Sequence, residues 1–169
     1  SKEAEPVSDA LDLQVIRLFA TNLESSCNNG DLASRTWCSL AATMSGVAYS
    51  NSHPNVCHAV GSPLTLFWEV DHGQAVGVTL PAMLRWTAPA IAPKLPALWD
   101  ALGVKGLDEA TVRIVQIMEN CGLKTSLSPL GVTLDGLETL VEHTRWDRVS
   151  QLPIPLGPDD LRRLLQDLI

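Results

Sequence analysis

The sequence is short of aromatic residues other than tryptophan, and it has no long apolar run. It contains two phenylalanines and one tyrosine against five tryptophans. Its longest apolar candidate, residues 73–86, contains Arg85 and is about 14 residues long, whereas a membrane-spanning helix needs roughly 20. We therefore expect a soluble chain with no membrane partner.

Positive charge and cysteine motifs are also scarce. Twelve Lys and Arg against 19 Asp and Glu give a formal net charge of −7. The basic residues are scattered, with Arg162 and Arg163 as an adjacent pair, so we expect no nucleic-acid partner. The four cysteines show no CxxC spacing, and the first residues lack the pattern of a signal peptide. Free thiols and a cytoplasmic location are the simplest expectation.

Strand signals are nearly absent, whereas helical spacing recurs. Apolar residues repeat every three or four positions, and no sustained two-residue alternation of β-branched residues occurs. A chain of 169 residues is long enough for one proper core. The sequence therefore predicts an all-α fold in a single domain over residues 1–169.

Turn and cap residues mark the expected helices. Pro6 suits a first turn, the tract NNGD ends that helix, and Asp31 is a plausible cap for the next helix, to about residue 49. The small side chains of SLAATMSGVA, residues 39–48, favour burial of this second helix on most sides. The prolines of residues 88–96 forbid one continuous helix there. Further helices are expected from about residue 56, at 72–86, and near 95–102, 108–121, 134–143 and 158–168.

His58 and His72 are the chemically interesting pair, because imidazole is a common ligand for zinc and iron. They lie 14 residues apart, so they converge only if the chain doubles back. Pro63 and the turn-like Asp71-His72-Gly73 supply a place for that reversal. The alternative is that both rings are partly buried and hydrogen-bonded to backbone carbonyls.

Two imidazoles do not complete a metal site, since structural zinc uses four protein ligands and catalytic zinc usually three. His53 stands in a turn beside Pro54, and His143 lies near a helix end. We expect both of these to be surface residues. Asp71 is adjacent to His72 and would have to turn the opposite way.

The segment from residue 50 to residue 86 resembles the signature of the iron-dependent alcohol dehydrogenases. In that family a SNxxxxxxHA turn leads through a proline-containing segment to HGxAxxxxLPxxLxxN. Residues 8–23 and 153–169 resemble, more weakly, the first helix and the closing proline turn and helix of the family's C-terminal domain. The matching residues are Ser50, Asn51, His58, Ala59, Pro63, Leu64, His72, Gly73, Ala75, Leu80, Pro81 and Leu84.

This resemblance implies a helical domain of the dehydroquinate synthase-like C-terminal type. It implies that His58 and His72 are two ligands of a divalent metal, Fe2+ or Zn2+, used for NAD(P)-linked alcohol oxidation or aldehyde reduction. The family's other two ligands, an aspartate and a histidine about four residues apart, have no counterpart here. Neither does the N-terminal nucleotide-binding domain, because no GxGxxG pattern occurs. We therefore expect that missing domain as a partner, and no turnover of a small alcohol or aldehyde by this chain alone.

Ser62 and Trp68 are the candidates for a substrate or cofactor pocket. Ser62 stands where several family members carry a second histidine near the nicotinamide, and serine is a poor proton relay unless a base adjoins it. Trp68, with Leu66 and Phe67, would wall an apolar pocket beside the metal. The alternative assigns Trp68 and Trp86 to the core.

A second function class also fits these residues. The chain would then be a non-catalytic interaction module, which retains the helical fold of the family but no longer catalyses its reaction. Surface that normally faces a missing partner domain is apolar, and such patches promote association. We therefore expect the isolated chain to form a homo-oligomer.

Overall fold

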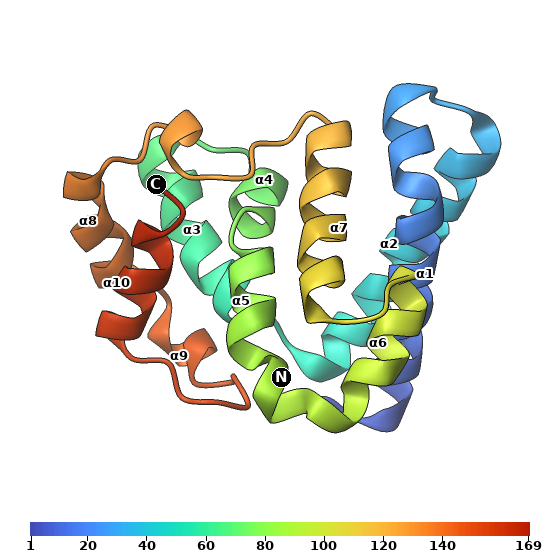
Figure 1. Ribbon diagram of the computed structural model, residues 1–169, viewed down its shortest axis with the longest axis horizontal. Coiled ribbons are helices and arrows are strands. Elements are labelled where there is room, and N and C mark those ends of the chain that lie inside the picture. Colours follow the sequence, from blue (N-terminus) through green and yellow to red (C-terminus); the bar gives the residue numbers. More distant parts are fainter. The chain divides into compact units, whose positions relative to one another are not determined.

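The computed structural model describes all 169 residues, and every regular element in it is a helix (Figure 1). The all-α prediction is confirmed. No helix combines the length and the apolar character that crossing a membrane requires. The chain divides into two compact units, one of residues 54–90 and 123–169 and the other of residues 2–53 and 91–122. The single domain expected over residues 1–169 stays a prediction.

In the second unit, α1 (Pro6–Asn28) begins as the sequence predicts. Pro6 occupies the first turn, where a missing N–H does no harm, and Glu5 is the N-cap. The Glu5 carboxylate accepts the Ser8 N–H at 3.1 Å, and the Ser8 hydroxyl oxygen accepts the Glu5 N–H at 3.1 Å. This reciprocal capping box satisfies two amides that the helix itself leaves without partners.

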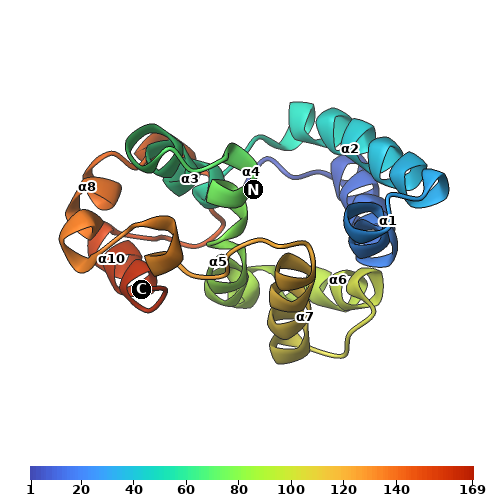
Figure 2. The same ribbon diagram turned by 90° about the horizontal axis from the view of Figure 1, so that it is seen from above.

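The next helix, α2 (Leu32–Ser52), forms a hairpin with α1, and Figure 2 shows the two side by side. Asp31 caps it as predicted, accepting the Ser34 N–H at 2.8 Å and the Ser25 hydroxyl at 2.8 Å. The expected burial on most sides is wrong, because Ser34, Ala41 and Ala48, one every seven residues, are its only buried positions. That spacing makes one narrow stripe against α1, and the remaining faces are largely exposed.

Polar contacts attach α6 (Leu95–Leu102) and α7 (Leu107–Asn120) to α1. The Arg17 guanidinium donates to the Asp100 carboxylate at 2.8 Å, which links α1 to α6. Arg113 of α7 donates to the Glu24 carboxylate at 2.6 Å and to the Ala20 carbonyl at 3.0 Å. The proline tract preceding α6 is the 3-10 segment η1 (Ala88–Lys94), broken at Ile91, so the predicted interruption is confirmed.

The first unit contains shorter helices. Residues 72–86, expected as one helix, form α4 (His72–Gly77) and α5 (Leu80–Thr87). The break follows from Pro81, which has no N–H to donate to the Gly77 carbonyl. The later elements of this unit are η2 (Ser128–Leu130), η3 (Leu134–Gly136), α8 (Leu137–Glu142), α9 (Trp146–Val149) and α10 (Pro158–Gln166).

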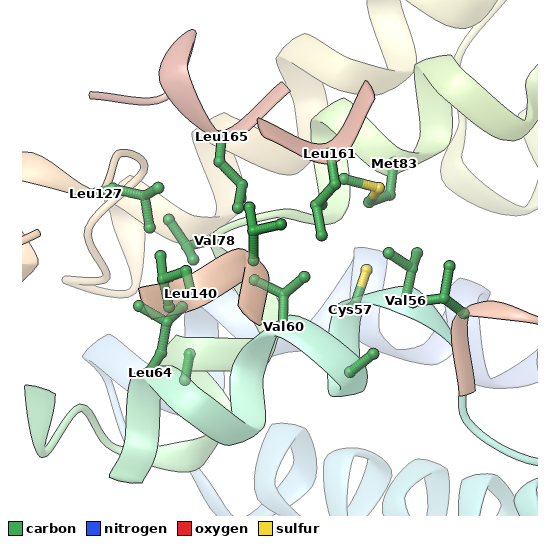
Figure 3. Close-up of a cluster of buried hydrophobic side chains, with 14 of the residues drawn as sticks. Val56, Cys57, Val60, Leu64, Val78, Met83, Leu127, Leu140, Leu161 and Leu165 are labelled. Carbon is green, nitrogen blue, oxygen red and sulfur yellow. The ribbon is translucent and has the colours of Figure 1, made fainter. Parts of the chain in front are cut away.

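The core of the first unit lies around α3 (Val56–Trp68). Figure 3 shows Val60 and Leu64 of this helix among leucines from α8 and α10. Leu161 and Leu165, four residues apart on α10, are fully buried on the same face of that helix. Burial of each such side chain contributes roughly 1.5–3 kcal/mol. This core holds α3 in place, and α3 carries the first candidate ligand.

Replacing Asp31 by alanine should destabilise α2, whereas Asp31→Asn should keep much of the cap because its amide oxygen accepts the same N–H. The bonds from Ser34 and then Ser25 lower the pKa of Asp31 to about 2. A depressed pKa stabilises the fold fully above the unfolded pKa of about 3.9, and this contribution is lost as the pH falls toward 2. Urea unfolding from pH 7 to pH 2 measures the gap between wild type and Asp31→Ala. A gap that stays constant down to pH 2 would contradict the assigned role.

Candidate metal centre

The helix α3 places His58 in its first turn and contains a proline in its middle. Pro63 has no N–H to donate to the Ala59 carbonyl four residues earlier. That carbonyl instead accepts the backbone N–H of Arg145, at 3.3 Å. Pro63 weakens α3, but the carbonyl that it leaves free binds the start of α9 beside His58.

The chain reverses directly after α3. Glu69 ends the helix in the left-handed conformation, with φ 54° and ψ 26°, and its N–H bonds the Leu64 carbonyl. Such a conformation costs a non-glycine residue roughly 1–2 kcal/mol, and it turns the chain through the αL type of helix cap. Three residues later α4 begins at His72 and packs back against α3. This is the reversal that convergence of the two histidines requires.

Gly61 marks a close approach between α3 and α4. A Cβ built on Gly61 would lie 2.9 Å from the Val76 Cγ2 and 3.2 Å from the backbone of Ala75 and Val76. Both distances are shorter than ordinary van der Waals contact, so a larger residue would push the helices apart. Gly61 lies one turn after His58, and Ala75 lies one turn after His72. The two histidines are therefore held across the same tight contact.

The imidazole rings of His58 and His72 lie with their centres 5.6 Å apart and their planes tilted by 60°. His58 is half-buried and His72 is exposed. Two imidazoles that bind one zinc ion through nitrogens at about 2.0–2.1 Å have ring centres about 5–6 Å apart. The pair therefore fits two positions of a shared coordination shell.

The environment of His58 favours its neutral form. Burial lowers the pKa of His58, and the nearby His72 and then Arg148 of α9 lower it further, because a second positive charge is unfavourable there. A neutral imidazole has the free lone pair that a metal ion requires. The surroundings of His58 therefore keep it in the form that binds a metal.

Neighbouring side chains supply no third ligand. Cys57 points into the apolar core (Figure 3), where burial raises the pKa of its thiol to about 11, so it stays protonated and inert. Asp71 is exposed at the N-cap of α4, without a side-chain capping bond. No cluster of three or more His, Cys, Asp or Glu side chains in the structure is arranged to hold a metal ion.

The other two histidines lie at the surface, as predicted. His53 is exposed and pairs with Glu3, with 3.4 Å between the His53 Nε2 and the Glu3 carboxylate oxygen. His143 is exposed, its Nδ1 lies 3.0 Å from the Thr139 carbonyl, and its ring packs edge-on against Phe67 at 4.6 Å.

Ser62 and Trp68 lie on α3 at different distances from the pair. Ser62 is one turn beyond His58, and its hydroxyl donates to the His58 carbonyl at 2.8 Å. Trp68 is ten residues beyond His58, about 15 Å along the helix axis. Its indole N–H donates to the Gly131 carbonyl at 3.2 Å, and its ring lies so close to Gly136 that a Cβ there would be 2.8 Å away. These contacts support the alternative interpretation of Trp68, in which it is a packing residue.

Three features of the site were missed in the sequence. Gly61 had a signal, since a glycine within a helical pattern often marks a close backbone approach. Arg145 and Arg148 had none, because α9 reaches His58 only through the tertiary structure. The left-handed Glu69 also gave no sign, since glutamate is an ordinary helix former.

Two solved structures share the fold of this chain. The chain superimposes on a 1,3-propanediol oxidoreductase with a TM-score of 0.91 and 25% identity, covering all of this chain and 47% of that one. It also superimposes on a sulfoacetaldehyde reductase from Bifidobacterium kashiwanohense with a TM-score of 0.92 and 23% identity, covering 99% of this chain and 45% of that one. Because its sequence identity is only 23%, the match to the sulfoacetaldehyde reductase shows a shared fold and nothing more.

Sequence comparison then gives the family. The family described as "Fe-containing alcohol dehydrogenase family, C-terminal" matches residues 1–168, so the chain belongs to this family. The 1,3-propanediol dehydrogenase of Klebsiella pneumoniae is 30% identical over 78% of this chain and 36% of its own length. The long-chain-alcohol dehydrogenase 1 of Geobacillus thermodenitrificans is 25% identical over 98% of this chain and 45% of its own length. The chain thus spans less than half of each relative.

Gly61→Ala should destabilise the chain by about 1–3 kcal/mol through overpacking against α4, less the roughly 1 kcal/mol that alanine gains in a helix. Gly46→Ala is the matched control, because Gly46 lies inside α2 and a Cβ added there would have no neighbour within 4 Å. That control should stabilise the chain by about 0.5–1 kcal/mol. Chemical unfolding measures both changes. Equal effects of the two substitutions would show that the α3–α4 contact is not tight.

Proposed function

We propose that His58 and His72 provide two ligands to a divalent metal ion, iron or zinc, in an NAD(P)-linked alcohol dehydrogenase. The observation that carries this proposal is the convergence of the two rings, 5.6 Å apart, across the Gly61 contact. Membership of the Fe-containing alcohol dehydrogenase family supports the choice of metal and reaction. The lowered pKa of His58 supports ligation by a neutral imidazole.

The remaining ligands and the dinucleotide site belong, in this proposal, to a nucleotide-binding domain that acts as the partner of these residues. The first unit offers two imidazoles, and a catalytic divalent metal usually takes three protein ligands. The relatives are also more than twice as long as the region they share with this chain. We therefore assign to this chain about half of the metal shell, and no alcohol turnover by itself.

The chemistry of the proposed site divides between the bound groups and the protein. A divalent ion there would act as a Lewis acid on the oxygen of an alcohol or aldehyde, and the nicotinamide would exchange the hydride. The protein's task is positioning, because α3 and α4 pack together and carry one imidazole each. Such preorganisation removes the cost of ordering these side chains when the metal binds.

Other residues of α3 complete the proposed pocket. Ser62 lies one turn from His58, but its hydroxyl is engaged with the His58 carbonyl, so we assign it a lining role and no proton transfer. Leu66 is 72% exposed and lies two turns beyond His58, which puts an apolar side chain on the same stripe of the helix. We assign Trp68, at the far end of α3, to packing against Gly131 and Gly136 and not to the pocket. An apolar lining suits a small alcohol or aldehyde.

A non-catalytic interaction module is the second candidate function. One observation favours it: α2 exposes several large apolar side chains along the faces that do not meet α1. Exposed apolar side chains that form a patch commonly mark a contact with another protein. The apolar residues concerned are Leu32, Trp37, Leu40 and Val47. In this reading the histidines bind no metal, and a homo-oligomer forms regardless of metal.

Replacing either ligand should weaken metal binding sharply. His58→Ala and His72→Ala are each expected to lower the affinity of the chain for Co2+ or Zn2+ by more than about tenfold, since even residues that only orient a ligand contribute roughly 10- to 100-fold. His53→Ala and His143→Ala are matched controls, because both remove an exposed imidazole elsewhere. Calorimetric titration measures the affinities. Metal binding that survives in both ligand variants would contradict the proposal and favour the interaction module.

The wild-type chain should bind these ions weakly and should not oxidise alcohols. Two ligands of a larger shell leave most of the chelation missing, so we expect a dissociation constant of about 1 μM or weaker at neutral pH. Reduction of NAD+ or NADP+ in the presence of a short alcohol and Zn2+ should stay at the background rate. Binding much tighter than micromolar, or measurable turnover, would show that the chain contains a complete site.

A further inference from the structure

In the second unit, α7 runs along α1 in a constant register. Arg113 bonds Glu24 and Ala20, which precede it by 89 and 93 residues, and the Asn28 side-chain amide donates to the Asn120 carbonyl at 3.0 Å, over 92 residues. Both helices therefore advance in the same direction past these contacts. Cys27 precedes Asn28, Cys121 follows Asn120, and the register brings these two thiols together at the C-terminal ends of α1 and α7.

The two thiols are free, and they differ in their surroundings. Cys27 is exposed, whereas Cys121 is only partly accessible. Burial and then a hydrogen bond with the Cys27 thiol raise the pKa of Cys121 to about 12, with smaller contributions from Glu24 of α1 and Cys38 of α2. Arg113 of α7 is engaged with Glu24. Cys27 is consequently the accessible nucleophile, and Cys121 is a protonated thiol directly beside it.

We propose that Cys27 and Cys121 form a modification site that closes to a disulfide by exchange with a low-molecular-weight disulfide such as oxidised glutathione. The Cys27 thiolate attacks one sulfur of oxidised glutathione, forms a mixed disulfide and releases one glutathione thiolate. Formation of the mixed disulfide removes the Cys27 thiol that helps to raise the pKa of Cys121. Cys121 then loses its proton to water and attacks the Cys27 sulfur, releasing the second glutathione. The two protein thiols lose two electrons, and oxidised glutathione gains them as two glutathione thiols.

Cys27 pairs with Cys121 and not with Cys38. The bond from the Asn28 side-chain amide to the Asn120 carbonyl holds the C-terminal ends of α1 and α7 together. Among the neighbouring thiols, Cys27 has the largest influence on the pKa of Cys121. Cys38 lies about two turns into α2 and influences Cys121 only through its charge. Closure of the pair joins the C-terminal ends of two helices that the Asn28 to Asn120 bond already holds together.

The test is oxidation of the chain with oxidised glutathione in EDTA, followed by alkylation and peptide mass spectrometry. We expect the wild type and Cys38→Ser to lose two free thiols and to yield a peptide linked through Cys27 and Cys121. Cys27→Ser and Cys121→Ser should yield none, although circular dichroism should show that both remain folded. Cys57, buried in the first unit, should stay unmodified in every variant.

Two results would overturn the inference. One is a link that contains Cys38 or joins two chains, and the other is a stable glutathione adduct on Cys27 that Cys121 does not displace. Thermal unfolding supplies a second readout, since the oxidised wild type should melt about 5 °C or more above the reduced chain. An equal rise in the Cys121→Ser variant would also count against closure. EDTA keeps these outcomes independent of the proposed metal function.

Discussion

The close approach of α3 and α4 at Gly61 is the contact on which the candidate site depends. Because Gly61 has no side chain, the backbone of Ala75 and Val76 can lie against α3, one turn from each histidine. The left-handed Glu69 makes this possible by reversing the chain within three residues. Imidazoles 14 positions apart in the sequence are thereby held 5.6 Å apart.

Pro63 links the stability of this region to its chemistry. A proline inside a helix removes one hydrogen bond and leaves a carbonyl without a partner, which is normally destabilising. Here the Ala59 carbonyl is bonded by Arg145, so the loss is offset and α9 is attached next to α3. The same attachment brings Arg148 near His58, where its charge helps to hold the imidazole neutral. One residue thus shapes both the backbone and the electrostatics of the pair.

Local signals predicted much of the fold, and they failed where tertiary contacts decide. Pro6 and Asp31 marked helix starts that the structure confirms, because capping depends on a few adjacent residues. Pro81 carried the signal for the break between α4 and α5, which an apolar pattern over residues 72–86 obscured. The burial of α2 was overestimated, since small side chains allow a close neighbour without providing one. The pairing of His58 with His72 was predicted only through the family resemblance, because their spacing alone fits no local motif.

The most direct test of the shared metal shell is a crystal structure of this chain grown with Co2+ and measured at the cobalt absorption edge. The account predicts one anomalous peak between the two rings, with a nitrogen of His58 and a nitrogen of His72 each about 2.1 Å from it. An ion bound by only one of these rings, or bound at His53 or His143 while the pair stays empty, would contradict it.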